Sequence, residues 1–135
     1  MKWVKDTGGR EKYYRKLTVG DCVVRAIAIA NNMDYKVTYN IIKNYNNGFS
    51  PRDGVNRKYY EAALKDMGWE YIPCCGRGHV GEYVRFNEKE LPTDEIIICK
   101  IDGHIAAVIN GVLHDTYDCS RQGTRHVYGY WKKRS

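Results

Sequence analysis

The sequence predicts a single α+β domain in which helices come first and an antiparallel sheet follows. Helical spacing of apolar residues is confined to positions 22–67, and β-prone runs separated by turn residues begin at position 69. The chain has 135 residues, of which 43% are hydrophobic, and this is enough to bury one sizeable core. No repeat or linker divides the sequence, so residues 1–135 are expected to form one domain with the helices packed on the sheet.

Three helices are expected in the first half of the chain, after an extended N-terminal arm over residues 1–19. The first helix spans about 22–31, where an alanine-rich run follows a polar turn. Asp34 is placed to cap a second helix over about 35–45, with Val37, Ile41 and Ile42 on its inner face. A third helix over about 56–67 ends at Gly68.

Strands are expected over residues 69–73, 96–101, 104–109, 112–117 and 126–131. Asn110-Gly111 separates the third strand from the fourth, and Asn-Gly is the strongest short signal for a two-residue hairpin turn. With this turn, residues 109 and 112 face each other, and residue 106 lies opposite 115. The same register puts His104 and Asp115 on one face as diagonal neighbours, about 7–8 Å apart at the backbone. An imidazole–carboxylate hydrogen bond is therefore within reach, whereas His114 and Asp118 point to the opposite face.

Cys22 stands where the first helix is expected to begin. A thiol at a helix N-terminus faces unpaired backbone N–H groups and the positive end of the helix dipole, and both favour the thiolate. This is the placement that a cysteine nucleophile needs. The alternative is a small core cysteine beside an ordinary helix start, with Asp21 as the N-cap.

Cys22, His104 and Asp115 together make a complete nucleophile, base and orienting acid. The three residues lie in three short segments: Asp21-Cys22-Val23-Val24-Arg25-Ala26, Gly103-His104-Ile105-Ala106-Ala107-Val108 and His114-Asp115-Thr116. These segments resemble the papain-like cysteine peptidase superfamily. The resemblance is closest to small bacterial and phage members, including the bacteriocin-leader-processing type. The Cys-x-x-Arg-Ala piece is also similar to the nucleophile helix of ovarian-tumour-type deubiquitinases. The resemblance implies a papain-like fold, with Cys22 as nucleophile, His104 as general base and Asp115 as its orienter.

The chain departs from the family pattern at the oxyanion hole. Many papain-like enzymes have a glutamine several residues before the cysteine, but the only glutamine here is Gln122. Donors to the oxyanion could instead be backbone N–H groups around Cys22, or the side chain of Lys16 or Thr18. Asp21 is a second departure, because a carboxylate beside the thiol opposes thiolate formation unless it is turned away.

A glycine-rich segment, Cys74-Cys75-Gly76-Arg77-Gly78-His79-Val80-Gly81, precedes the second expected strand. We interpret it as a loop bordering the substrate site, with Gly76, Gly78 and His79 as candidate contacts. A zinc site would need four ligands, and this segment would have to borrow one from Cys99 or Cys119. The glycine spacing also matches a dinucleotide fingerprint, but no helix follows it. No metal and no cofactor is therefore expected.

The predicted function is that of a cysteine hydrolase, a peptidase or isopeptidase that acts on a peptide or protein through a thioester. Deamidases and acyltransferases use the same triad, so they remain open. The alternative is a non-catalytic module on the same scaffold that binds nucleic acid or an acidic protein, since the net charge is +6 and basic residues gather at both ends. Nucleic acid is not favoured, because no recognised binding motif is present.

The remaining expectations concern the surroundings of the protein. No run of about 18 apolar residues is present, so no association with a membrane is expected. The N-terminus lacks an apolar signal-peptide core, and five cysteines, an odd number, indicate reduced thiols. These features favour the cytoplasm and leave the oligomeric state open.

Overall fold

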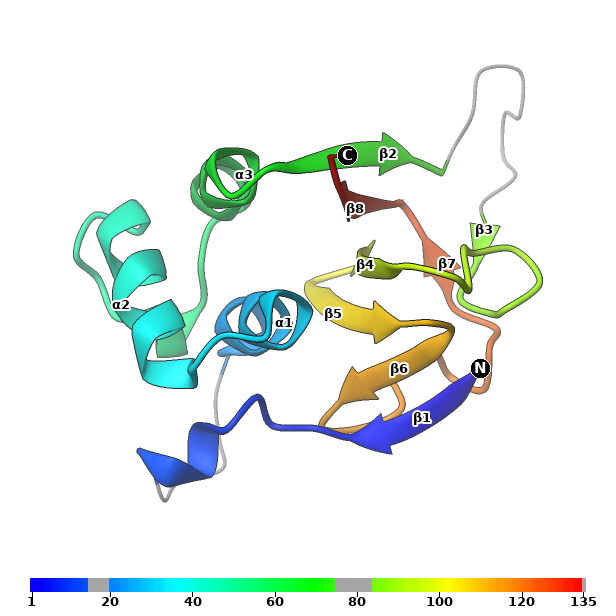
Figure 1. Ribbon diagram of the computed structural model, residues 1–135, viewed down its shortest axis with the longest axis horizontal. Coiled ribbons are helices and arrows are strands. Elements are labelled where there is room, and N and C mark those ends of the chain that lie inside the picture. Colours follow the sequence, from blue (N-terminus) through cyan, green and yellow to red (C-terminus); the bar gives the residue numbers. More distant parts are fainter. Residues whose placement is uncertain (15–19, 75–83, 135) are drawn as a thin grey trace.

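The computed structural model describes residues 1–14, 20–74 and 84–134, and it has helices packed on one face of a six-stranded sheet (Figure 1). The helices are α1 (Cys22–Asn31), α2 (Tyr35–Tyr45) and α3 (Arg57–Asp66), close to the predicted bounds. The strands are β1 (Lys2–Lys5), β2 (Trp69–Pro73), β3 (Val84–Arg85), β4 (Ile96–Ile101), β5 (His104–Ile109), β6 (Val112–Asp115), β7 (His126–Val127) and β8 (Gly129–Lys133). Two short 3₁₀ helices, Arg10–Lys12 and Pro51–Asp53, complete the described elements. The predicted α+β class is confirmed.

The sheet is mixed, although the strands of the C-terminal half pair antiparallel with one another, as predicted. Its strand order is β1-β6-β5-β4-β8-β2, and β1 pairs with β6 in parallel. The predicted extended arm thus supplies an edge strand, which is anchored where the Trp3 Nε1 donates to the Asp115 carbonyl oxygen at 3.0 Å. Its four residues are all exposed, so they lack the apolar alternation by which a buried strand is recognised.

The predicted strand over residues 126–131 is divided into two. Its first part, β7, pairs with β3 in a separate two-stranded sheet, and its second part, β8, joins the main sheet. The break falls at Tyr128, whose backbone N–H donates to the Lys100 carbonyl oxygen at 2.9 Å. The predicted strand over 112–117 ends at Asp115, whose carboxylate accepts a hydrogen bond from the next backbone N–H.

The inner face of α2 differs from the predicted one. Asp34 caps the helix as expected, because its carboxylate accepts from two backbone N–H groups in the first turn. Val37 points outward, with 51% of its surface exposed, and Ile41 is only partly buried. The buried residues are Tyr35, Thr38, Tyr39 and Ile42. Tyr35 and Tyr39 fill this face because each carries a large apolar ring whose hydroxyl needs only one polar partner.

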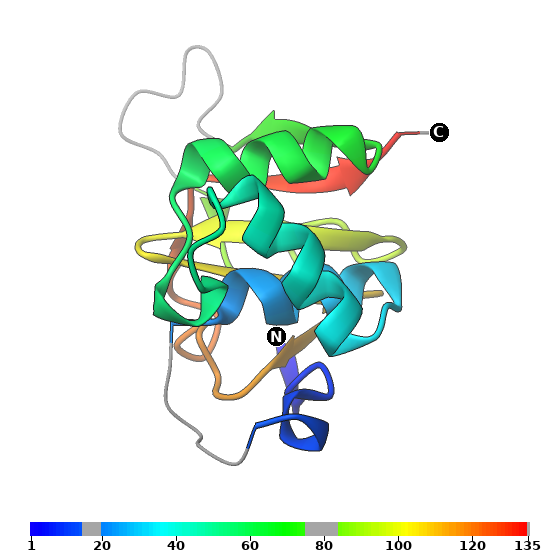
Figure 2. The same cartoon turned by 90° about the vertical axis from the view of Figure 1, so that its left-hand side faces the viewer.

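Both faces of the sheet are covered by apolar side chains. Helices α1 and α3 pack on one face, and α2 packs on these two helices; Figures 1 and 2 show all three on the same side of the strands. Loops and the β3–β7 pair cover the other face, where Phe86, Leu91, Cys119 and Val127 pack against the strands. Trp69 and Trp131 are buried core residues, as predicted. Within the described residues, no helix is long and apolar enough to cross a membrane.

The hairpin between β5 and β6 has the predicted register. Residues Ile109 and Val112 pair directly, and the pairing continues to Ala107 and His114. Both turn residues have left-handed backbone angles, φ 48° for Asn110 and φ 79° for Gly111, as a type I′ turn requires. The register therefore follows from two residues that adopt these angles at little cost.

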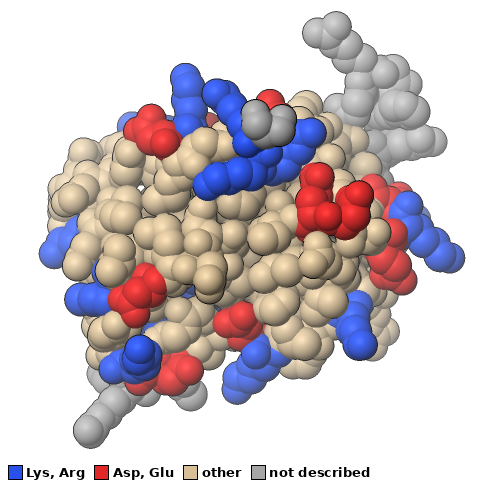
Figure 3. Space-filling model, viewed as in Figure 1, with Lys and Arg blue, Asp and Glu red and all other residues tan. Residues whose placement is uncertain are grey.

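Charged side chains of both signs are spread over the face of the molecule shown in Figure 3, and Lys and Arg gather near the C-terminal end of the chain. Interspersed acidic and basic groups of this kind are typical of a solvated surface.

Candidate active site

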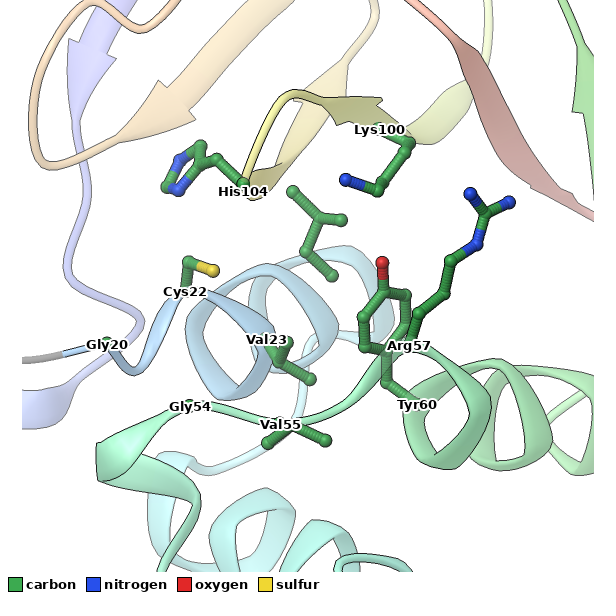
Figure 4. A pocket seen from close by; sticks show the side chains of 11 residues that line it. Gly20, Cys22, Val23, Gly54, Val55, Arg57, Tyr60, Lys100 and His104 are labelled. Carbon is green, nitrogen blue, oxygen red and sulfur yellow. The ribbon is translucent and has the colours of Figure 1, made fainter.

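The structure brings together the three residues that the sequence analysis assigned to catalysis. Cys22 is the first residue of α1, His104 is the first residue of β5, and Asp115 is the last residue of β6. The His104 Nε2 and the Asp115 Oδ2 are 2.6 Å apart. The Cys22 thiol and the His104 ring line the same pocket and shift each other's pKa, and Figure 4 shows the two side chains on the same side of the pocket.

The two ring nitrogens of His104 have different partners. Because Asp115 engages Nε2, Nδ1 is the ring nitrogen that stays available to Cys22. In the neutral ring, Nε2–H then donates to the carboxylate, and Nδ1 is left free to accept the thiol proton. The hairpin register therefore sets not only the contact but also the tautomer that a general base requires.

The environment of Cys22 favours its thiolate. Burial raises the pKa of the thiol, but the hydrogen bond and positive charge of His104, together with the Ile105 backbone N–H and the Arg25 charge, bring the pKa below its ordinary value. The first intrahelical hydrogen bond runs from the Arg25 N–H to the Asp21 carbonyl oxygen. The backbone N–H groups of residues 22–24 therefore precede the helical ladder and point toward the same end.

The other described cysteines have the opposite character. Burial raises the pKa of Cys74 to about 11, and burial also raises the pKa of Cys99 and of Cys119. Among the cysteines that the structure describes, Cys22 alone has a lowered pKa, so it is the one that thiolate chemistry would select.

His104 and Asp115 complete a charged pair at neutral pH. Burial lowers the pKa of His104, but its hydrogen bonds to Asp115 and Cys22 outweigh this effect and raise it to about 9. Burial raises the pKa of Asp115, but its hydrogen bond to His104 and the charges of His104 and Arg25 bring it below the ordinary value. The arrangement thus favours a thiolate, an imidazolium and a carboxylate together.

Asp21 is turned away from the thiol into a buried ion network. It makes no side-chain cap on α1; its Oδ1 accepts from the Arg10 Nη1 at 3.0 Å and from the Arg25 Nε at 2.9 Å. Its Oδ2 accepts from the Tyr35 hydroxyl at 2.9 Å. The carboxylate is fully buried, and its charge is balanced by the two guanidinium groups. The predicted conflict between Asp21 and the thiolate is resolved in this way.

Arg25 joins this network to the candidate triad. Its Nη1 donates to the Asp115 Oδ1 at 2.6 Å, whereas His104 contacts the other carboxylate oxygen, Oδ2. Four buried charged residues alternate in sign, and each residue is at most 6% exposed: Arg10, Asp21, Arg25 and Asp115. Sequence reasoning missed this role. The available signal was the position of Arg25, four residues after Asp21 on the same helix face.

Several candidate residues lie outside the described parts of the chain. These are the oxyanion candidates Lys16 and Thr18, and the substrate-loop candidates Gly76, Gly78 and His79. The candidate zinc ligand Cys75 lies there too, whereas Cys99 and Cys119 are buried. Cys119 is hydrogen-bonded to Asp115, and its sulfur lies within 4.8 Å of ligand atoms of His104 and Asp115. Three ligands of this kind are one short of a structural zinc site.

A pocket of about 450 Å³ opens beside Cys22 and His104. Val23 and Val55 form an apolar part of its wall, and Arg57, Tyr60 and Lys100 line the part away from His104 (Figure 4). The Cys22 thiol is therefore at the edge of a space large enough to receive part of a peptide.

No protein-family model matches the sequence, and comparisons with curated proteins and with solved structures give no significant match. The function is therefore inferred from the geometry of these residues.

Proposed function

We propose that this protein is a cysteine hydrolase with a papain-like arrangement, in which Cys22, His104 and Asp115 cleave an amide bond. The observation that carries the proposal is the 2.6 Å contact between the His104 Nε2 and the Asp115 Oδ2, made beside a Cys22 thiol whose pKa His104 lowers. A structural cysteine has no need of an oriented base with a second, acidic partner. The substrate class is a peptide or a protein.

The reaction begins with the thiolate and the imidazolium. The Cys22 sulfur attacks the carbonyl carbon, so a C–S bond forms and the carbonyl π electrons move to oxygen. When the intermediate collapses, the C–N bond breaks, and the His104 Nδ1–H gives its proton to the leaving nitrogen. A thioester on Cys22 and a neutral His104 remain.

Water completes the cycle. The neutral His104 takes a proton from water as its oxygen attacks the thioester carbon. The C–S bond then breaks, a carboxylic acid leaves, and the thiolate–imidazolium pair is restored. In a deamidase the first leaving group is ammonia, and in an acyltransferase an amine replaces the water, so the same residues serve all three outcomes.

The oxyanion can be bound by the start of α1. The Cys22 and Val23 backbone N–H groups lie before the first intrahelical hydrogen bond, and both residues line the pocket. Donors fixed by the backbone stabilise developing charge without reorganisation. The positive end of the helix dipole acts in the same direction.

The proposal is tested by incubating a cell-derived peptide library with the wild type and with the Cys22→Ala variant, followed by mass spectrometry. We expect products that only the wild type forms: a gain of water on cleavage, a glutamine converted to glutamate, or a new amide from acyl transfer. Cys74→Ala is the matched control, because Cys74 is a half-buried thiol with a raised pKa, and this variant should act like the wild type. The proposal is wrong if Cys22→Ala forms every product that the wild type forms.

A further inference from the structure

The pocket beside Cys22 has a cationic end whose polar groups take no part in the proposed chemistry. Arg57 comes from the first turn of α3, and Lys100 comes from β4. Figure 4 shows the Lys100 ammonium above the Tyr60 hydroxyl and Arg57 beside the Tyr60 ring, on the far side from the Cys22–His104 pair. The residues that line the described pocket include no aspartate or glutamate.

Lys100 lies on the helix-facing side of the sheet and is partly buried. Its Nζ donates to the Ile101 carbonyl oxygen at 2.6 Å, and an ammonium group has three donors, so two remain for a ligand. Burial lowers the pKa of Lys100, and the positive charge of Arg57 lowers it further. Arg57 and Lys100 line the same pocket and repel each other, and Lys100 is partly desolvated. An anion bound between them would relieve this repulsion.

Arg57 is only partly neutralised by its neighbours. Its Nε donates to the Glu61 Oε1 at 2.5 Å, and both side chains are more than two-fifths exposed. Tyr71 is a further partner of the guanidinium, whose Cζ lies 5.1 Å from the centroid of that ring. A guanidinium has five N–H donors, so these two partners leave donors for a ligand.

Tyr60 supplies a hydroxyl near the nucleophile. Its ring packs edge-on against Trp131, with the centroids 5.6 Å apart, so its position is fixed by the core. Burial raises the pKa of Tyr60 to about 12, so the hydroxyl stays protonated and donates. The Cys22 charge acts on both Tyr60 and Lys100, which places the cationic end within electrostatic reach of the sulfur.

We propose that this end of the pocket binds the side-chain carboxylate of an aspartate or glutamate next to the scissile amide, in the residue that supplies the acyl group. Lys100 and Arg57 would pair with the carboxylate, and the Tyr60 hydroxyl would donate to it. Val23 and Val55 would contact the aliphatic part of the same side chain. This substrate preference rests on the proposed function, because it assumes that Cys22 is acylated.

The test compares matched reagents that differ only in charge. Acyloxymethyl ketones with aspartate or asparagine next to the reactive ketone form a C–S bond with a thiolate and release the acyloxy group as a carboxylate. Iodoacetate and iodoacetamide form a second pair and release iodide. The second-order rate of Cys22 modification is followed by intact mass and peptide mapping for the wild type and for the variants Lys100→Met, Arg57→Gln and Lys58→Gln.

We expect the wild type to prefer the aspartyl ketone by about tenfold or more, the order of one hydrogen bond between charged groups. Lys100→Met and Arg57→Gln should each lose most of this preference. Lys58→Gln removes the same charge at a neighbouring helix position outside the pocket lining, and it should keep the preference. Each variant is judged by the ratio of the charged to the neutral reagent, so a change in thiolate reactivity cancels.

Equal wild-type rates with the aspartyl and asparaginyl ketones overturn the proposal. So does a preference that survives in both Lys100→Met and Arg57→Gln. In these two cases the rapid modification of Cys22 still supports a cysteine hydrolase. If no reagent modifies Cys22 faster than Cys74, the proposed function fails, and this preference fails with it.

Discussion

Replacement of Arg25 by methionine tests whether the buried ion network holds the candidate triad in place. Methionine keeps most of the side-chain length and removes the charge. In the wild type, the Arg25 guanidinium donates to the Asp21 Oδ1 at 2.9 Å and to the Asp115 Oδ1 at 2.6 Å. In the variant, Asp21 keeps the hydrogen bonds donated by Arg10 and Tyr35. The Asp115 Oδ1 keeps the hydrogen bond from the Thr116 backbone N–H, at 2.7 Å.

The expected loss of stability is large because the charges are buried. Breaking a buried ion pair by removing one partner costs about 3–5 kcal/mol. For a domain of this size, the thermal midpoint should then fall by roughly 10–20 °C. Arg57→Met is the matched control, because Arg57 is paired with Glu61 at the surface, and loss of that pair should change stability by about 0.5 kcal/mol or less.

Urea unfolding of Arg25→Met, Asp115→Asn and the double variant measures the coupling between the two residues. Once Asp115 is neutral, Arg25 no longer stabilises it, so Arg25→Met should cost less in that background. We expect a coupling free energy of at least about 1 kcal/mol. If the two single losses simply add, or if Arg25→Met is as mild as Arg57→Met, the network does not hold Asp115 in the way described.

Three further predictions concern activity, the turn and the surface. The ratio kcat/KM of the Cys22-dependent reaction should fall as the pH rises through about 9, where the His104 imidazolium loses its proton. In a measured pH profile, Asp115→Asn should move this fall to lower pH, because the amide no longer stabilises the imidazolium. A fall at the same pH in the variant contradicts the assignment. Gly111→Ala should lower the free energy of unfolding by about 1–2 kcal/mol in urea, because an L residue is strained at φ 79°. An added Cβ there also meets the Thr93 side chain at 3.3 Å, so Gly48→Ala, with the same φ and no neighbour within 4 Å, should cost less; a larger loss at Gly48 contradicts this reasoning. Finally, no electrophoretic shift of DNA or RNA is expected at physiological salt, and a tight, salt-sensitive shift that neutralisation of Lys132, Lys133 and Arg134 abolishes would favour the binding-module alternative.

The sequence was sufficient where local rules decide the structure. The Asn110-Gly111 turn set the β5–β6 register, and this register alone selected the His104–Asp115 contact. Helix bounds followed from caps and spacing, as in α2 after Asp34.

The sequence was insufficient where contacts between distant segments decide. The strand β1 has no buried residue, and it forms because an edge of the sheet is open at β6. The Arg10–Asp21–Arg25–Asp115 network joins three segments, and a charged residue in a sequence is normally assigned to the surface. The role of Tyr35 was missed for the same reason, since its hydroxyl is meaningful only once Asp21 is buried beside it.

The central claim is that His104 holds Cys22 as a thiolate, and the pH dependence of Cys22 alkylation tests it most directly. The second-order rate with iodoacetamide is measured from pH 5 to 10 in the wild type and in His104→Asn, with Cys74 as the internal reference. We predict that wild-type Cys22 reacts rapidly below pH 7, where Cys74, with a pKa of about 11, is almost wholly protonated. The rate in His104→Asn should instead rise along a single titration at higher pH. Equal pH profiles for Cys22 in the two proteins would contradict the account.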